Sequence, residues 1–287
     1  MDVFIPWDSQ GMEEWRAKYA QGEFVSFDGK STHYIEKGSG EPVILVHGFF
    51  MDLHTWMHNI DALAEHYQVF AFDLWGLGYS SRASLDYGYD LYVRQLLSFM
   101  DVLGIQKAAL IGHSLGGGTI IKFSVDYPQR VNKLVLVDAA GFPNRLPLRA
   151  KLFNLPGVGE FLMSLNSNFF RRMNLQDLWF FDNSRLTETV FEELTRFQKI
   201  RGSTEAMMGL LRPEFFHTLG SEIEQLGSMD LPVLVVWGRN ETNIPLEVGM
   251  KLYQALKGSR MQIIDHAGHM PNFEQPETFN EIVLNFL

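Results

Sequence analysis

The chain has 287 residues, 46% of them hydrophobic and 20% charged, which suits one large globular domain or two small ones and gives no sign of disorder. Its formal net charge is −10 and it has no dense run of Lys and Arg, which argues against general nucleic-acid binding. It contains no cysteine, which excludes disulfides, thiolate metal ligands and a cysteine nucleophile.

The N-terminal residues 1–22 are predicted to form a small helical extension. Met12, Trp15 and Tyr19 have helical spacing, and the apolar stretch from Asp2 to Trp7 is short. No stretch approaches the roughly 18 to 20 apolar residues of a membrane span, and the N-terminus lacks the pattern of a secretory signal. We therefore expect a cytoplasmic protein, with peripheral contact of this segment with a membrane surface as the alternative.

Short apolar runs alternate with helix-length segments over most of the chain. Residues 23–38 alternate in polarity around Asp28-Gly29, which predicts a hairpin. Apolar runs bounded by turn residues then predict strands at 42–48, 68–74, 108–112, 133–138, 232–238 and 261–264. Strands that are apolar on both faces and separated by helices predict a parallel sheet covered on both sides, with function gathered at the carboxyl ends of the strands.

Residues 142–231 interrupt this alternation, because they carry helical patterns and no convincing strand. We expect a core made of residues 1–141 and 232–287, with residues 142–231 as a helical cap over the strand ends. The insertion holds eleven of the chain's 23 phenylalanines, an excess that predicts a hydrophobic substrate pocket. Candidate pocket residues, one from the core and three from the insertion, are Phe50, Trp179, Phe180 and Met207.

Ser114 is the candidate nucleophile. It lies in a G-x-S-x-G pattern directly after the apolar run 108–111 and directly before a helix-compatible stretch. Gly112 and Gly116 let the neighbouring chain pack closely enough for a strained turn, which lifts the hydroxyl above the sheet edge. The N–H groups of the following helix then point at an oxyanion formed there.

A serine hydroxyl needs a base, and the base needs a carboxylate that fixes its tautomer. His269 follows the last predicted strand, and Gly268 gives its loop the freedom to reach the serine, whereas His266 is expected to be an ordinary loop residue. For the carboxylate two candidates remain open: Glu241, the acid in the loop after 233–237, and Asp138, just beyond 135–137.

Two backbone N–H groups are expected to stabilise the oxyanion. One belongs to Leu115, which follows the nucleophile, and the other to Phe49, in the loop after His47-Gly48. His47 is expected to tie down that loop. Other motifs are weaker: His54 and His58 lack the glutamate of H-E-x-x-H, and Gly76-Leu77-Gly78 is not G-x-G-x-x-G. We therefore expect no metal and no dinucleotide.

With these motifs in this order, the sequence resembles the α/β-hydrolase fold superfamily over about residues 23 to 287. The matching segments are His47-Gly48-Phe49, Phe72 to Ser80, Gly112 to Gly117, Trp237-Gly238 and Gly268-His269. The resemblance implies a mostly parallel eight-stranded sheet flanked by helices, with a helical cap inserted between strands 6 and 7. It also implies the roles given above for Ser114, His269, Leu115 and Phe49, without cofactor or metal. The family usually has aspartate where this chain has Glu241.

Within that superfamily the sequence predicts a carboxylesterase or monoacylglycerol-lipase-like hydrolase. Haloalkane dehalogenases and epoxide hydrolases of this fold carry an aspartate in place of Ser114, and hydrolases of ring-cleavage products usually have a Gly/Pro-rich oxyanion loop, unlike residues 49–52. The expected partner is a small hydrophobic ester, and the expected state a monomer or homodimer. Thioester hydrolysis, perhydrolysis, lyase chemistry or a receptor-like ligand-binding role are the alternatives.

Overall fold

The computed structural model describes residues 4–83, 85–142, 155–165, 167–211 and 218–287. One eight-stranded sheet forms its centre, in the order β1-β2-β4-β3-β5-β6-β7-β8. The strands are β1 (Glu23–Phe27), β2 (Lys30–Lys37), β3 (Pro42–Val46), β4 (Gln68–Phe72), β5 (Ala108–His113), β6 (Val131–Val137), β7 (Val233–Gly238) and β8 (Arg260–Ile264).

The sheet is mostly parallel. β1 and β2 form the predicted hairpin, and β2 pairs antiparallel with β4, while every pairing from β4 through β3 to β8 is parallel. Each parallel strand ends at the same edge, so the loops after β3, β5, β6, β7 and β8 gather there. This arrangement confirms the fold class predicted from the sequence.

Both faces of the sheet are buried under helices, as strands apolar on both faces require. Ile44 and Val46 pack into one core cluster, and Val43 and Leu45 into the other, because successive side chains point to opposite faces. The first cluster includes residues of α3 (Tyr89–Val102), α4 (Leu115–Asp126) and α11 (Leu246–Ala255); the second includes residues of α2 (Ile60–Ala64) and α13 (Pro276–Leu284). Three short helices complete the core: η1 (Leu53–Trp56), η2 (Pro128–Arg130) and α12 (Pro271–Glu274).

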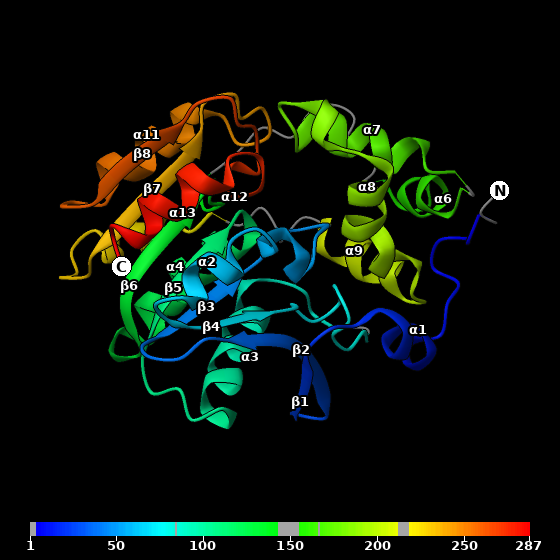
Figure 1. Ribbon diagram of the computed structural model, residues 1–287, viewed down its shortest axis with the longest axis horizontal. Helices are drawn as coiled ribbons and strands as arrows, with labels where there is room; N and C mark the ends of the chain where they lie inside the picture. The colour runs from blue at the N-terminus through cyan, green and yellow to red at the C-terminus, as the bar shows by residue number, and fades with distance from the viewer. Residues whose placement is uncertain (1–3, 84, 143–154, 166, 212–217) are drawn as a thin grey trace.

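Between β6 and β7 the described residues form helices and no strand, as predicted. They are α6 (Val158–Ser164), α7 (Phe169–Leu178), η3 (Asn183–Arg185), α8 (Glu188–Thr195), η4 (Arg196–Lys199), α9 (Ser203–Leu211) and α10 (Gly220–Leu226). Figure 1 shows α6 to α9 together at one side of the sheet. Of the phenylalanines counted in this insertion, three lie outside the described residues: Phe153, Phe215 and Phe216. No described helix is long and apolar enough to cross a membrane.

The N-terminal segment packs against this insertion. The predicted helix is present as α1 (Met12–Tyr19), with Trp15 buried, and lies near α9 in Figure 1. Before it, Gln10 forms a parallel bridge with Ile200, and the N–H of Asp8 donates to the carbonyl oxygen of Gln198 at 3.1 Å. The segment before α1 therefore holds the backbone of η4 in place.

Candidate active site

Ser114 lies in a sharp turn between β5 and α4. Its φ of +52° and ψ of −115° form a conformation that strains a residue with a side chain. Glycines make the turn possible: a Cβ on Gly116 would lie 2.2 Å from the carbonyl oxygen of Val46, and one on Gly112 would lie 2.5 Å from the carbonyl oxygen of Gly116. The strained strand-to-helix turn predicted from the sequence is therefore present.

His269, in the loop after β8, meets Glu241, in the loop after β7. Nδ1 of His269 donates a hydrogen bond to Oε2 of Glu241, and both side chains are buried. The other carboxylate oxygen of Glu241 accepts from the N–H of Asn243. Because the carboxylate fixes the proton on Nδ1, Nε2 is the basic nitrogen. It is buried and has no hydrogen-bond partner among the described residues.

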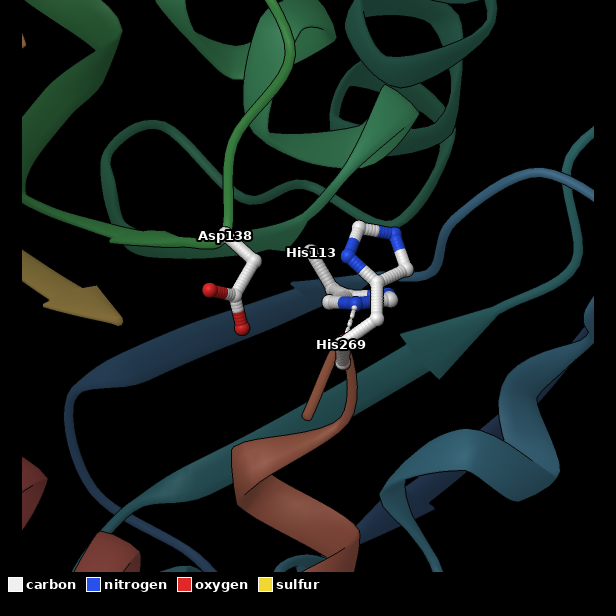
Figure 2. Close-up of side chains that lie close together, drawn as sticks. All are labelled: His113, Asp138 and His269. Carbon is white, nitrogen blue, oxygen red and sulfur yellow. Dashed lines mark hydrogen bonds between the residues drawn. The ribbon is translucent and has the colours of Figure 1, made fainter. Parts of the chain in front are cut away.

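His113 connects the serine turn to the histidine loop. It precedes Ser114, and its Nε2 donates to the carbonyl oxygen of His269 at 2.5 Å, the dashed line in Figure 2. Burial, and secondly the neighbouring His269, hold the pKa of His113 well below its ordinary value, so its ring is neutral. Within the described residues no hydrogen bond joins Ser114 to His269 itself, and His113 is the link between them.

Asp138, the second candidate for the carboxylate, bonds elsewhere. Its Oδ1 accepts from the N–H of Gly238 at 3.0 Å, and its Oδ2 has no hydrogen-bond partner in the described part of the chain. Burial raises the pKa of Asp138 well above its ordinary value, and the nearby Glu241 carboxylate raises it further. The structure therefore joins Glu241, rather than a neutral Asp138, to the imidazole.

His113, Asp138 and His269 also have potential ligand atoms within 4.8 Å of one another, the one such group among the described residues (Figure 2). One nitrogen of each ring is already in a hydrogen bond, Nδ1 of His269 to Glu241 and Nε2 of His113 to a backbone carbonyl. The other nitrogen of each ring, Nε2 of His269 and Nδ1 of His113, and Oδ2 of Asp138 have no hydrogen-bond partner among the described residues.

The loop after β3 lies directly against the serine. A Cβ on Gly48 would lie 2.8 Å from Nδ1 of His113 and 3.0 Å from Cβ of Ser114. His47 fixes this loop as predicted: its Nδ1 donates to the carbonyl oxygen of Gly48 at 2.8 Å, and its Nε2 accepts from the N–H of Leu74 at 3.0 Å. The loop that carries Phe49 is therefore held beside the N-terminus of α4, where Leu115 begins the helix.

Glu274, in α12, was missed by the sequence analysis. Its side chain is buried and accepts three backbone hydrogen bonds, from Phe181 and Asp182 at 2.9 Å each and from Gly268 at 2.6 Å. A further hydrogen bond joins the histidine loop to the insertion without Glu274: the N–H of His269 donates to the carbonyl oxygen of Trp179 at 3.0 Å. No motif in the sequence marks this acid, because its partners are backbone N–H groups.

Three of the four candidate pocket residues belong to, or pack against, one apolar cluster that reaches His269 through Trp179. Trp179 packs edge-on against His269, with ring centroids 4.9 Å apart, and Phe180 packs against Phe273. Phe50 packs against the same apolar cluster as these residues. Met207 belongs instead to the large cluster over the sheet.

The weaker motifs are accounted for by packing and hydrogen bonds. His54 pairs with Asp52 at 3.1 Å, and that carboxylate raises the pKa of His54 to about 9. The ring of His58 packs on Phe273. His266 lies in the same loop as His269, and its ring centroid is 6.2 Å from that of Phe181.

The chain matches known proteins over most of its length. The family model described as "alpha/beta hydrolase fold" matches residues 41–276. The dihydrolipoyllysine-residue acetyltransferase component of the acetoin cleaving system of Cupriavidus necator is 32% identical over 286 residues, which cover 98% of this chain and 72% of that protein. The 2-hydroxy-6-oxo-6-(2'-aminophenyl)hexa-2,4-dienoic acid hydrolase of Metapseudomonas resinovorans is 31% identical over 273 residues, with 92% and 90% covered.

A solved structure also matches this chain over most of its length. A meta-cleavage product hydrolase from Pseudomonas fluorescens IP01 superposes with a TM-score of 0.80 at 27% identity, over 92% of this chain and 97% of that one. Hydrolases of ring-cleavage products are thus among the proteins that this chain resembles, although its residues 49–52 lack the Gly/Pro-rich composition expected of them. By the extent of these matches, the chain belongs to the α/β-hydrolase fold family.

Proposed function

We propose that this protein is a serine hydrolase that cleaves carboxylic esters of apolar acyl groups through an acyl-enzyme on Ser114. The observation that carries the proposal is the imidazole of His269, bonded at Nδ1 to Glu241 and without a partner at a buried Nε2, beside the strained turn of Ser114. A base prepared in this way serves acyl transfer by a neighbouring hydroxyl.

In this mechanism His269 takes the proton of the Ser114 hydroxyl at Nε2 as Oγ attacks the ester carbonyl. Glu241 stabilises the imidazolium that forms. The N–H groups of Leu115 and Phe49 bind the oxyanion. The tetrahedral intermediate collapses, the leaving alcohol receives the proton from His269, and the acyl group stays on Ser114. Water then attacks the acyl-enzyme with the same base, releasing the acid and restoring the serine.

An apolar substrate fits the surroundings of the imidazole. Trp179 packs against it, and the cluster around Trp179 is made of aromatic and aliphatic side chains. The carboxylate of Glu241, bonded to the imidazole, opposes a bound anion. We take residues 142–231 as the cap that supplies this apolar wall to the core of residues 1–141 and 232–287.

The second candidate function is C–C hydrolysis of a ring-cleavage product, which the relatives' names favour. The substrate named for the curated relative is an acid, so its carboxylate would need a cation. Arg171, on α7 of the insertion, is buried with Nη1 unpartnered and could supply one. A neutral ester needs no cation in the site.

Steady-state kinetics with both substrate classes test the proposal. We expect turnover of 4-nitrophenyl esters of acetate to octanoate, with Ser114→Ala reducing kcat at least 10³-fold, and little turnover of a hydroxy-oxo-dienoate. Efficient cleavage of the dienoate with poor ester turnover would replace ester hydrolysis by the second candidate. Ester turnover that survives in Ser114→Ala would remove the serine mechanism.

A further inference from the structure

Gln198 lies in η4 of the helical insertion, and its side chain reaches the loop after β3. Its Nε2 donates to the carbonyl oxygen of Phe50 at 3.3 Å, and its Oε1 accepts from Nε of Arg171 at 2.9 Å. Gln198 is 3% exposed and Arg171 is 5% exposed. Because a guanidinium only donates and a carbonyl only accepts, these two partners fix which way the amide points.

The glutamine itself has little freedom to move. Arg171 lies over the ring of Trp7, 3.9 Å from the centroid, and its Nη2 donates to the carbonyl oxygen of Met163 at 3.1 Å. The backbone of Gln198 is held by the N–H of Asp8. Both the insertion and the N-terminal segment therefore fix Gln198 in front of Phe50.

The backbone of Phe50, which accepts the hydrogen bond from Gln198, is in a strained conformation. Its φ is +60°, in the left-handed region that a residue with a side chain adopts only when its surroundings impose it. Phe49 precedes it, and Gly48 before that packs against Ser114. If Phe50 relaxes to negative φ, the peptide between Phe49 and Phe50 turns, and the N–H of Phe49 moves with the loop.

We propose that Gln198 is a positioning residue for the oxyanion loop, which holds Phe50 in its strained conformation and thereby keeps the N–H of Phe49 aimed at the oxyanion. The inference rests on the proposed acyl transfer at Ser114 and deepens it, because it makes the helical insertion part of transition-state stabilisation. Gln198 acts through Phe50 and needs no contact with the substrate.

The Gln198→Glu variant separates this role from a purely structural one. A glutamate still accepts from Arg171 and gives that buried cation a counter-ion, but it cannot donate to Phe50. Loss of a whole oxyanion donor costs about 10²- to 10³-fold in rate, so a displaced donor is expected to cost about 10- to 100-fold. We expect that fall in kcat for a 4-nitrophenyl ester, with KM within about threefold and Tm no lower than that of the wild type.

The matched control is Gln225→Glu, the same change at an exposed position of α10, which should leave kcat, KM and Tm unchanged. Gln198→Met, which removes both side-chain hydrogen bonds at similar length, provides the second variant and should also lower kcat. A kcat within twofold of wild type in folded Gln198→Glu would overturn the proposal. So would failure of both variants to fold, since Gln198 would then be structural.

Phosphonylation rates distinguish this inference from the proposed function. A fluorophosphonate forms its covalent bond at the nucleophilic serine with assistance from the oxyanion donors, whatever the natural substrate. No reaction with the wild type would contradict acyl transfer itself. Reaction of the wild type and Gln198→Glu at equal rates would contradict the role of Gln198 alone, whereas a 10- to 100-fold slower variant supports it.

Discussion

At the scale of single residues, the charge states around His269 follow from burial and bonding. Glu241 shares the imidazole proton, while Asp138, equally buried, bonds a backbone N–H and is driven toward its neutral form. The two acids therefore differ in bonding and in charge, although both follow strand ends near the same histidine. Each assignment leads to a prediction for the corresponding amide variant.

Glu241→Gln should lower kcat strongly, by about 10⁴-fold, as the corresponding change does in a serine protease. An amide cannot carry the charge that stabilises the imidazolium, and it no longer selects the Nδ1-protonated tautomer. The measurement is kcat for an ester, with Glu247→Gln, an exposed acid on α11, as the matched control. A loss below about tenfold would show that another group orients His269.

Asp138→Asn should leave kcat within about threefold, because an amide resembles a neutral acid. Its effect should appear in stability against pH. The folded pKa of Asp138 is raised, so the folded state holds this proton more tightly, and its contribution to stability is present at low pH and lost as pH rises above the ordinary value of 3.8. Denaturant unfolding from pH 4 to 8 should therefore show a free energy that falls more steeply in wild type than in Asp138→Asn. Parallel curves would mean that Asp138 is ionised.

At the scale of elements, buried hydrogen bonds connect the loops after β3, β5, β7 and β8 with one another and with the insertion. These bonds join segments that are far apart in the sequence. Glu274 binds the histidine loop at Gly268 and the insertion at Phe181 and Asp182. The segment after α7 is therefore attached to the loop of His269, and the two should move as one unit.

Glu274→Gln tests this attachment. A glutamine has one acceptor oxygen, so its amide nitrogen faces at least one N–H that the carboxylate accepted. Hydrogen bonds to charged groups contribute about 1.5 to 3 kcal/mol each, and we expect a loss of that size in the free energy of unfolding, with a lower kcat as the His269 loop loosens. Glu277→Gln, exposed on α13, is the control. Unchanged stability and kcat in Glu274→Gln would contradict the attachment.

At the scale of the whole molecule, local pattern was enough to predict the sheet, the insertion and the turn at Ser114. The strands are apolar on both faces, and Gly112 and Gly116 leave room that a turn of this kind needs. The meeting of His269 with Glu241 was predicted as one of two options, because both candidate acids follow parallel strands that end at the same edge. Only the hydrogen bond distinguishes them.

What the sequence could not provide depends on contacts across the fold. Gln198 and Phe50 are 148 positions apart, and neither belongs to a recognisable motif. Glu274 is bonded through backbone N–H groups, which leave no trace in residue type. The composition of residues 49–52 does not show what holds this loop, which is the packing of Gly48 and the hydrogen bond that the carbonyl oxygen of Phe50 accepts. Partners of this kind become visible only in three dimensions.

The central claim is that Ser114 is the nucleophile activated by His269. Treating the protein with a fluorophosphonate and mapping the adduct by peptide mass spectrometry tests it most directly. We predict one adduct per chain, on Ser114, formed rapidly in the wild type and at least 10³-fold more slowly in His269→Ala. An adduct on another residue, or none on the folded wild type, would contradict the claim.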